Sequence, residues 1–280
     1  MLSRLLVWRV LPVVVALAVA ATGLVAVDRA TSATSAPERL PDLVQVTPTG
    51  LVVARAGTDA TAPYVLGFRS AVSNVGDGPL IIDGHRPGPE VGTMVADQVV
   101  ERDGAPQLVV PGVGRLQYVV SPDHRLWHLL GFDRYELRRS GAVAAAVRDQ
   151  KTGFCLGDRY TETATALRST RAPVPAYTTR CGLGEPQLLG VREGISVGYG
   201  DNYNANLEGQ YLRLTGLPAG RYLLIHRVNA DRRLRELDYG NDAASLLLDL
   251  RWRGAQPIVR VLKQCPATDR CAVARRHARA

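Results

Sequence analysis

The sequence predicts an all-β protein, a β-sandwich of short antiparallel strands joined by long loops, behind an N-terminal signal or anchor segment. Apolar, β-branched runs of strand length recur along the chain, and Gly, Asp, Asn and Pro separate them. No segment of the sequence carries a sustained helical stripe of apolar residues. Short strands with turns between them are typical of sandwiches and barrels. The runs lie at residues 64–72, 79–82, 107–110, 116–120, 135–139, 142–147, 211–214, 222–228 and 244–250.

Two segments rich in glycine and proline are predicted to join neighbouring strands. They are Pro111-Gly-Val-Gly114 and Leu217-Pro-Ala-Gly220, and these two residue types supply the backbone angles that tight turns need. One run has two interpretations, because Ala142–Val147 reads Ala-Val-Ala-Ala-Ala-Val and could form a helical turn instead of a strand.

The first 27 residues read as a signal peptide or a membrane anchor. Arg4 and Arg9 precede an apolar run, Val10–Val27, whose 18 residues are at the lower limit for a membrane span. Ala18-Val-Ala20 offers a small-residue cleavage site, so cleavage and anchoring both stay open, and both deliver the rest of the chain outside the cytoplasm. Residues 28–40 then read as a linker, residues 41–271 as one domain, and residues 272–280 as a basic C-terminal tail.

The four cysteines of this exported chain indicate two disulfides. Cys265 and Cys271 enclose a five-residue loop that a local bridge can close, which leaves Cys155 and Cys181 to pair across a longer connection. Zinc is the alternative, but neither pair has two-residue spacing and no histidine follows at the distance of a zinc finger. Disulfides are therefore favoured over a metal site.

The formal net charge is +8, which would permit a nucleic acid or an anionic surface as partner. The arginines are dispersed, however, and no aromatic and basic platform of the kind that single-strand binders use is present in the sequence. We therefore expect no nucleic-acid partner. Acidic cell-wall polymers or lipid headgroups are the partners that fit an exported basic protein, and a merely solvated basic face is the simpler alternative.

Only two of the 34 basic residues are lysines, Lys151 and Lys263. An arginine carries charge but is never a nucleophile in a protein, whereas a lysine amine can be deprotonated and attack a carbonyl or a quinone. Lys151 lies four residues before Cys155, so a disulfide would hold the backbone near it. Lys151 is therefore a candidate reacting group, with an ordinary surface lysine as the alternative.

A possible metal site lies in the segment His124-Arg-Leu126-Trp-His128. On a strand, residues 124, 126 and 128 point to one face, so the two imidazoles would face the same side. Imidazole suits copper and zinc, and copper(II) binds a given nitrogen site most tightly among the divalent first-row ions. The alternative is a pair of histidines that pack with Trp127 at a polar edge of the core.

Five ordered blocks of sequence resemble the catalytic domain of the lysyl oxidases, especially their bacterial members. The resemblance extends over roughly residues 40 to 265 and includes both the histidine segment and the lysine segment. The blocks are His-x-x-Trp-His followed by Phe-x-x-Tyr-Glu-Leu at 124–137, Lys-Thr-Gly-Phe-Cys-Leu-Gly-Asp at 151–158, Gly-Ile-Ser-Val-Gly-Tyr-Gly-Asp-Asn-Tyr at 194–203, Gln-Tyr-Leu-Arg-Leu-Thr-Gly-Leu-Pro-Ala-Gly-Arg-Tyr-Leu-Leu at 210–224, and Glu-Leu-Asp-Tyr-Gly-Asn-Asp at 236–242.

The resemblance implies an amine oxidase with a cofactor built from its own side chains. In this family copper and dioxygen convert a tyrosine to a quinone, and a lysine amine adds to it to form lysine tyrosylquinone. The matching residues here are Tyr203 and Lys151, in a segment, Gly198–Tyr203, that reads as a loop. The implied substrates are primary amines or protein lysines, which become aldehydes with release of hydrogen peroxide and ammonia. Asp201 is a candidate base for the substrate α-proton, and a turn aspartate that caps its own backbone is the alternative.

One departure from the family pattern concerns copper directly. Members of the family carry His-x-His-x-His, whereas the central position here is Leu126, which cannot bind a metal. Asp123, Asp133 or His226 could replace the missing ligand. Two hypotheses follow, an exported copper-dependent amine oxidase, and a copper-deficient domain of the same ancestry with a binding or structural role at the cell surface.

Overall fold

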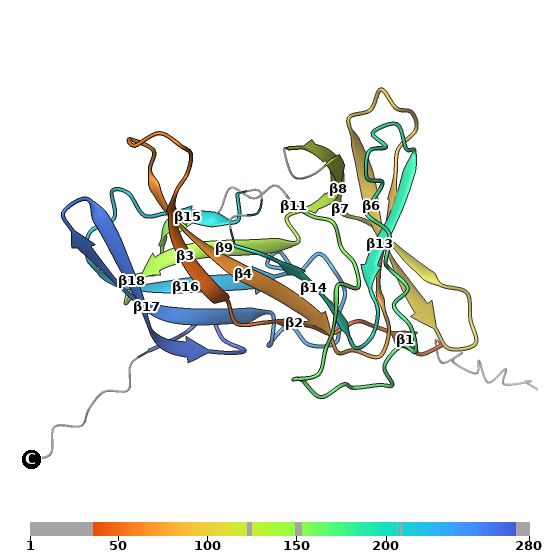
Figure 1. Ribbon diagram of the computed structural model, residues 1–280. Helices are drawn as coiled ribbons and strands as arrows, with labels where there is room; N and C mark the ends of the chain where they lie inside the picture. Colours follow the sequence, from red (N-terminus) through yellow and green to blue (C-terminus); the bar gives the residue numbers. More distant parts are fainter. Residues whose placement is uncertain (1–35, 122–124, 149–152, 206, 208, 273–280) are drawn as a thin grey trace, which may run out of the picture. The chain divides into compact units, whose positions relative to one another are not determined.

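A computed structural model describes residues 36–121, 125–148, 153–205, 207 and 209–272. These residues form an all-β unit that contains no helix, and every paired strand in it is antiparallel (Figure 1). The predicted fold class is confirmed. Accordingly, no helix that could span a membrane is found in this part of the chain.

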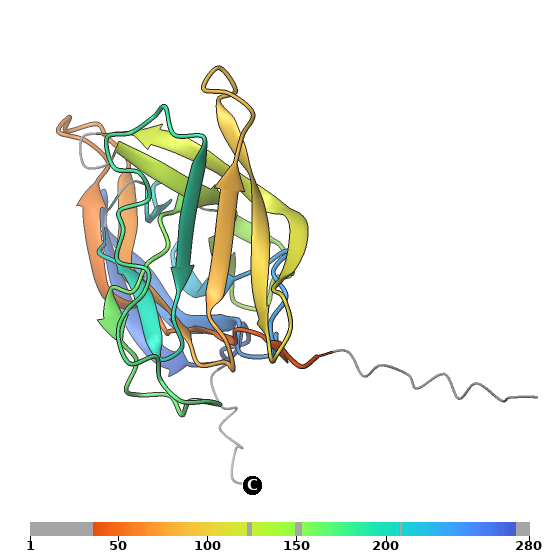
Figure 2. The ribbon, with the colours of Figure 1, turned by 90° about the vertical axis from the view of Figure 1, so that its right-hand side faces the viewer.

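The first of three sheets has seven strands. Its main path runs β11-β8-β7-β6-β5-β13, and β1 pairs with β6 at the side. Figure 2 shows β5, β6 and β7 side by side in this sheet. The strands are β1 (Glu38–Arg39), β5 (Leu80–His85), β6 (Thr93–Arg102), β7 (Leu108–Val120), β8 (Arg125–Leu130), β11 (Gly153–Phe154) and β13 (Gly190–Ile195).

The second sheet has five strands in the order β10-β9-β16-β17-β18, and the third has six, with β4 at its centre. β4 pairs with β14 and β15 along one edge and with β2 and β3 along the other. The strands of the second sheet are β9 (Asp133–Arg139), β10 (Ala145–Arg148), β16 (Gly220–Val228), β17 (Ala243–Arg253) and β18 (Gln256–Cys265). Those of the third are β2 (Leu43–Gln45), β3 (Thr49–Arg55), β4 (Tyr64–Asn74), β12 (Tyr160–Thr161), β14 (Tyr199–Tyr203) and β15 (Tyr211–Arg213).

All three sheets contribute side chains to one hydrophobic core. Leu116 of β7, Phe68 of β4 and Leu224 of β16 are fully buried members of it. Because side chains alternate along a strand, β16 also presents residues to its other face. There Leu223 and Ile225 form a second, small core with Leu247, Cys265 and Cys271.

One of the two predicted strand connections is wrong, whereas the other and the predicted strand at 142–147 are confirmed. Pro111–Gly114 does not join two strands, because β7 continues through it. The register with β6 shifts there, and the Gly112 amide donates to Asp97, so a β-bulge absorbs the residues that resembled a turn. The run 142–147 forms a strand at its end, β10, rather than a helical turn. The segment Leu217–Gly220 does connect two strands, β15 and β16.

A buried carboxyl pair connects the start of the domain to the loop before β17. Glu236 accepts hydrogen bonds from the Leu43 amide (3.0 Å) and from Asn229, and it shares a hydrogen bond with Asp242. Burial raises the pKa of Glu236 to about 7. Burial, followed by the charge of Glu236, raises the pKa of Asp242 to about 8. The pair therefore holds protons at neutral pH that ordinary carboxyl groups release.

These raised pKa values predict that the fold loses stability as the pH rises. From about pH 4, where unfolded carboxyl groups ionise, up to about pH 8, the folded protein holds protons that the unfolded chain has released. The free energy of unfolding then falls with rising pH. We expect Asp242→Asn to flatten this dependence, and the control Asp238→Asn, at a half-exposed side chain in the same loop, to leave it unchanged. Thermal unfolding between pH 5 and 8 measures how the free energy of unfolding depends on pH. EDTA is added so that no divalent cation neutralises the carboxyl pair. Equal slopes against pH for wild type and Asp242→Asn would contradict the prediction.

Candidate functional site

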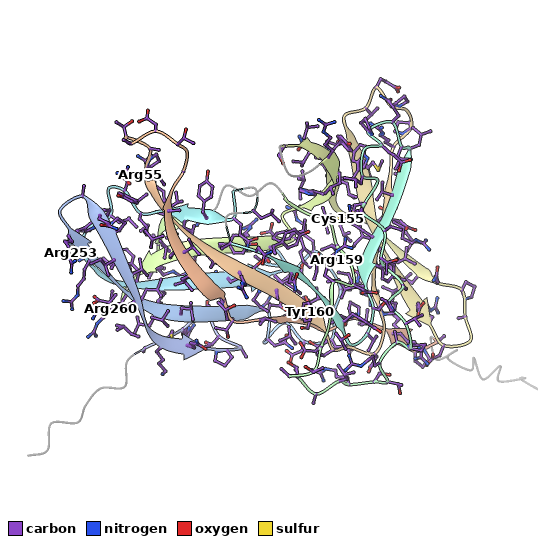
Figure 3. All side chains as sticks on the ribbon, viewed as in Figure 1. Arg55, Cys155, Arg159, Tyr160, Arg253 and Arg260 are labelled. Atoms are coloured by element: carbon purple, nitrogen blue, oxygen red, sulfur yellow. A yellow bond between two sulfur atoms is a disulfide. The ribbon has the colours of Figure 1, made fainter. Side chains whose placement is uncertain are left out.

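A cavity of about 410 Å³ collects residues that the sequence singled out. β8, β14 and the segment after β11 form its walls, and Figure 3 labels two of its residues, Cys155 and Arg159, which lie in contact with each other. The cavity is lined by Leu126, Cys155, Arg159, Arg180, Leu183, Asp201, Asn202, Tyr203 and Leu207. The structure thus brings the candidate tyrosine, the candidate base and one candidate disulfide together.

Tyr203 is the last residue of β14, so the segment that read as a loop is a strand paired with β4. Its phenol oxygen accepts a hydrogen bond from the Cys155 amide (3.0 Å) and donates one to the Cys155 carbonyl (2.8 Å). Its ring meets Phe154 edge to face, with 4.8 Å between centroids. Burial, and then the charges of Asp201 and Glu193, raise the pKa of the Tyr203 phenol well above its ordinary value. The phenol is therefore held in its neutral form.

Asp201 lies on the same face of β14 as Tyr203, because the two residues are two positions apart on a strand. It is a buried strand residue, 4% exposed, and not a turn aspartate. The Arg159 guanidinium lies 3.9 Å from its carboxylate. A carboxylate beside an arginine, facing the cavity that holds the phenol, is suited to accept a proton from a bound molecule.

Glu193 belongs to the same region, and sequence reasoning missed it. It lies on β13, is fully buried, and accepts a hydrogen bond from the Leu156 amide (3.3 Å). Burial raises the pKa of Glu193 well above 4.5, because a buried site disfavours the charged form of a carboxyl group. Glu193 stands between Arg192 and Gly194, a sequence context that does not indicate a buried side chain. Its burial depends on how β13 packs against the segment 155–156.

The histidine segment places one candidate ligand inside the described structure. His128 is fully buried on β8, and Leu126, on the same face of that strand, lines the cavity. The strand β11 packs so closely that a Cβ atom on Gly153 would come within 3.1 Å of the His128 Cβ. His124 and Lys151 lie outside the described residues, as does Asp123.

Two of the suggested replacement ligands are bound to each other. His226 Nε2 lies 2.5 Å from the Asp133 carboxylate, and its Nδ1 lies 2.7 Å from the Gln45 side-chain amide. Phe68 and Tyr135 pack against the imidazole ring. His226 thus has a partner on each ring nitrogen, and it serves the core rather than an open coordination site.

The described residues fit copper incompletely. One group with metal-ligand spacing occurs among them, Cys155, Cys181 and Glu193, but its two sulfurs form a disulfide and are no thiolate ligands. A second disulfide joins Cys265 and Cys271, so both cysteine pairs are bridged as expected. Of the two histidines expected to bind copper, the described part of the chain contains His128, on the face of β8 that also carries Leu126.

A larger cavity of about 870 Å³ adjoins the first and shares Asn202 and Tyr203 with it. Threonines and asparagines make up much of its wall, and Tyr160 of β12 lies beside it. The Tyr160 phenol shares a hydrogen bond with Ser73 (2.7 Å), and burial raises its pKa to about 12. The end of β14, at Asn202 and Tyr203, therefore contributes to the walls of both cavities.

The comparisons with known proteins agree with the sequence pattern. The profile of the family described as lysyl oxidase matches residues 107–261, more than half of the chain. A search of curated proteins found no match. The matched range contains β8, the Cys155–Cys181 disulfide, and β14 with Asp201 and Tyr203. The chain therefore belongs to the lysyl oxidase family.

Proposed function

We propose that this protein is an exported, copper-dependent amine oxidase of the lysyl oxidase type. It would convert primary amines, either small or as protein lysines, to aldehydes. The observation that carries the proposal is the Tyr203 phenol, fixed against the Cys155 main chain in a cavity that also holds Asp201. Lys151 precedes this contact by four residues and would supply the amine that adds to the Tyr203 ring.

The proposed reaction consumes one amine, one dioxygen and one water, and it yields one aldehyde, one ammonia and one hydrogen peroxide. The substrate carbon loses two electrons and dioxygen gains them. Asp201 would accept the proton that leaves the α-carbon, and Arg159 would keep that carboxylate oriented. Burial disfavours the charged form of Glu193, so of the two carboxyl groups we assign the proton acceptor to Asp201.

Copper, when bound, would enable dioxygen to oxidise the Tyr203 ring. We propose His128 and His124 as its protein ligands, since imidazole suits copper. Leu126 contributes no ligand atom, and His226 and Asp133 are engaged with each other. Weak copper binding is therefore part of the proposal, because two imidazoles make an incomplete ligand set.

Two features with different physical causes support the proposed export. Disulfides persist in oxidising compartments, and both cysteine pairs of this chain are bridged. The basic and apolar N-terminal segment has the composition of a signal peptide or an anchor. We propose that the oxidase works outside the cytoplasm, where its amine substrates would belong to surface proteins or to small molecules.

The second candidate function is a copper-deficient binding or structural module at the cell surface. Leu126 favours it, because a buried leucine, 7% exposed, occupies the position where the family has an imidazole. Such a module could retain Tyr203 and the disulfides as parts of its core.

One experiment separates the two functions. The exported protein is incubated with copper and air, digested, and mapped by mass spectrometry for a peptide that links the segment of Lys151 to that of Tyr203. We expect the linked peptide together with hydrogen peroxide release on adding a primary amine. Separate, unmodified segments in a protein with measured copper would reject the oxidase and leave the surface module.

Restoring the missing imidazole should strengthen copper binding. Position 126 shares the face of β8 with His128 and lines the cavity, so Leu126→His would place a ligand atom there. We expect copper affinity to rise by at least roughly 10- to 100-fold, measured by competition with a chelator. Leu126→Gln, polar but without imidazole, is the control. Equal affinities for Leu126→His and wild type would show that copper does not bind at this strand.

A further inference from the structure

We propose that the Cys155–Cys181 disulfide is a positioning element for Tyr203, which it fixes through the main chain of Cys155. The inference rests on the proposed function for its biological meaning, since it gives that disulfide a task in preparing the cofactor tyrosine. The contacts that support it join residues within the described part of the chain. The two disulfides then have different roles.

The main chain of a single residue binds the Tyr203 phenol in both directions. The Cys155 amide donates to the phenol oxygen at 3.0 Å, and the phenol donates to the Cys155 carbonyl at 2.8 Å. A phenol oxygen that donates and accepts in this way has its proton and its ring orientation fixed together. The position of the ring in the cavity therefore depends on where the backbone of Cys155 lies.

Cys155 is held on two sides. On its N-terminal side, β11 pairs with β8, and a Cβ atom on Gly153 would come within 2.5 Å of the Leu129 carbonyl oxygen. On its other side, the disulfide joins Cys155 to Cys181, which is fully buried. The Cys181 carbonyl accepts from the Trp127 amide at 2.9 Å, so the bridge is anchored on β8 as well.

The disulfide matters because strand pairing near Cys155 is short, so that single hydrogen bonds hold most of the segment after it. β11 has two residues, and the chain after Phe154 leaves the sheet. The connection from Cys155 to Cys181 spans 26 positions, and within it only the two-residue β12 pairs with another strand. Without the bridge, the chain after Cys155 would be held by single hydrogen bonds, such as the Leu156 amide to Glu193 (3.3 Å) and the Arg159 amide to the Gly200 carbonyl (2.8 Å), and the phenol would follow any shift of the Cys155 backbone.

Phe154 completes the arrangement from the ring side. Its ring packs edge to face on Tyr203, with 4.8 Å between centroids, and on the core residue Phe132, with 5.8 Å between centroids. Phe154 therefore links the Tyr203 ring to the packed core. The Cys265–Cys271 disulfide packs instead against Leu223, Ile225 and Leu247 in the small core on the other face of β16. The chain thus contains its own control.

The test compares two double variants, Cys155→Ala with Cys181→Ala, and Cys265→Ala with Cys271→Ala, both without copper. In protein labelled with carbon-13 at the tyrosine Cζ, the Tyr203 resonance is assigned with Tyr203→Phe and followed with pH. We expect the wild type and the second variant to keep the Tyr203 pKa raised, because its phenol stays buried. In the first variant we expect Tyr203 to titrate near pH 10, its ordinary value. A Tyr203 that titrates alike in both variants would overturn the proposal.

A second measurement addresses the consequence for cofactor formation. With copper and air, we expect the rate at which the linked peptide appears to fall at least tenfold in the first double variant and to stay near wild type in the second. If the first variant does not fold, the second double variant, which retains the Cys155–Cys181 bridge, is titrated before and after thiol reduction, and the Tyr203 pKa should fall toward about 10 only after reduction. A wild type that forms no linked peptide rejects the proposed function, whereas the titration decides the positioning role by itself.

Discussion

Tyr203→Phe is expected to abolish amine oxidation while leaving the fold intact. Phenylalanine keeps the ring contact with Phe154 but lacks the oxygen, so the ring cannot become the carbonyl that a substrate amine would attack. We expect hydrogen peroxide release to fall by at least roughly 10³-fold, the scale at which loss of a covalent catalyst acts. The two lost hydrogen bonds to Cys155 should cost about 1–3 kcal/mol of stability in total.

Tyr199→Phe is the matched control for this substitution. Tyr199 lies on the same strand and the same face as Tyr203, and it is also buried, at 9% exposed. The control should keep its oxidase activity, which a coupled peroxide assay measures alongside copper content. Comparable activity in Tyr203→Phe and Tyr199→Phe would mean that another group carries the chemistry.

Asp201→Asn is the second substitution with a large expected effect. The amide cannot take the proton that leaves the substrate carbon, so kcat should fall by about 10²- to 10⁴-fold. The change also removes a charge that raises the pKa of the Tyr203 phenol, so Tyr203 should titrate at a lower pH than in the wild type. Single-turnover kinetics with a deuterated amine measure the first effect, and tyrosine titration measures the second.

Glu193→Gln separates the role of Asp201 from a general need for acids in this region. Burial disfavours the charged form of Glu193, and glutamine is an uncharged side chain of nearly the same shape. We expect its kcat to match the wild type within error. If Glu193→Gln lost as much activity as Asp201→Asn, the proton acceptor would be a shared pair rather than Asp201.

The strands that are easiest to predict from the sequence pair with a neighbouring strand along both edges. The run 222–228 is β16, which pairs with β9 and β17 and is therefore apolar over most of its length. The strand β14 escaped prediction, because Gly200, Asp201 and Asn202 have low strand propensity. Its pairing with β4 and the packing of Tyr160 over Gly200 stabilise it instead, and both are tertiary contacts. The bulge in β7 likewise depends on its neighbour β6.

In the site, too, some features could be predicted from the sequence and others depend on tertiary contacts. Asp201 and Tyr203 could be chosen from their sequence blocks, and a strand then puts them on one face. The hydrogen bonds of Tyr203 to Cys155 could not be predicted, because they join β14 to a segment 48 residues away. Nor could the pairing of His226 with Asp133, which lie 93 residues apart and meet because β9 and β16 are neighbours. Sequence patterns identify reactive residues, and the packing of strands determines which of them meet.

The small core on the outer face of β16 and β17 sets a limit on how the protein can be trimmed for expression. Leu223, Ile225 and Leu247 are shielded from solvent by the loop that the Cys265–Cys271 bridge closes. A truncation before Cys271 would expose these apolar side chains and leave Cys265 as an unpaired thiol. Both changes promote aggregation, the first through contacts between apolar surfaces and the second through intermolecular disulfides. A purification tag therefore belongs after Ala272, beyond the last buried residue of the described chain.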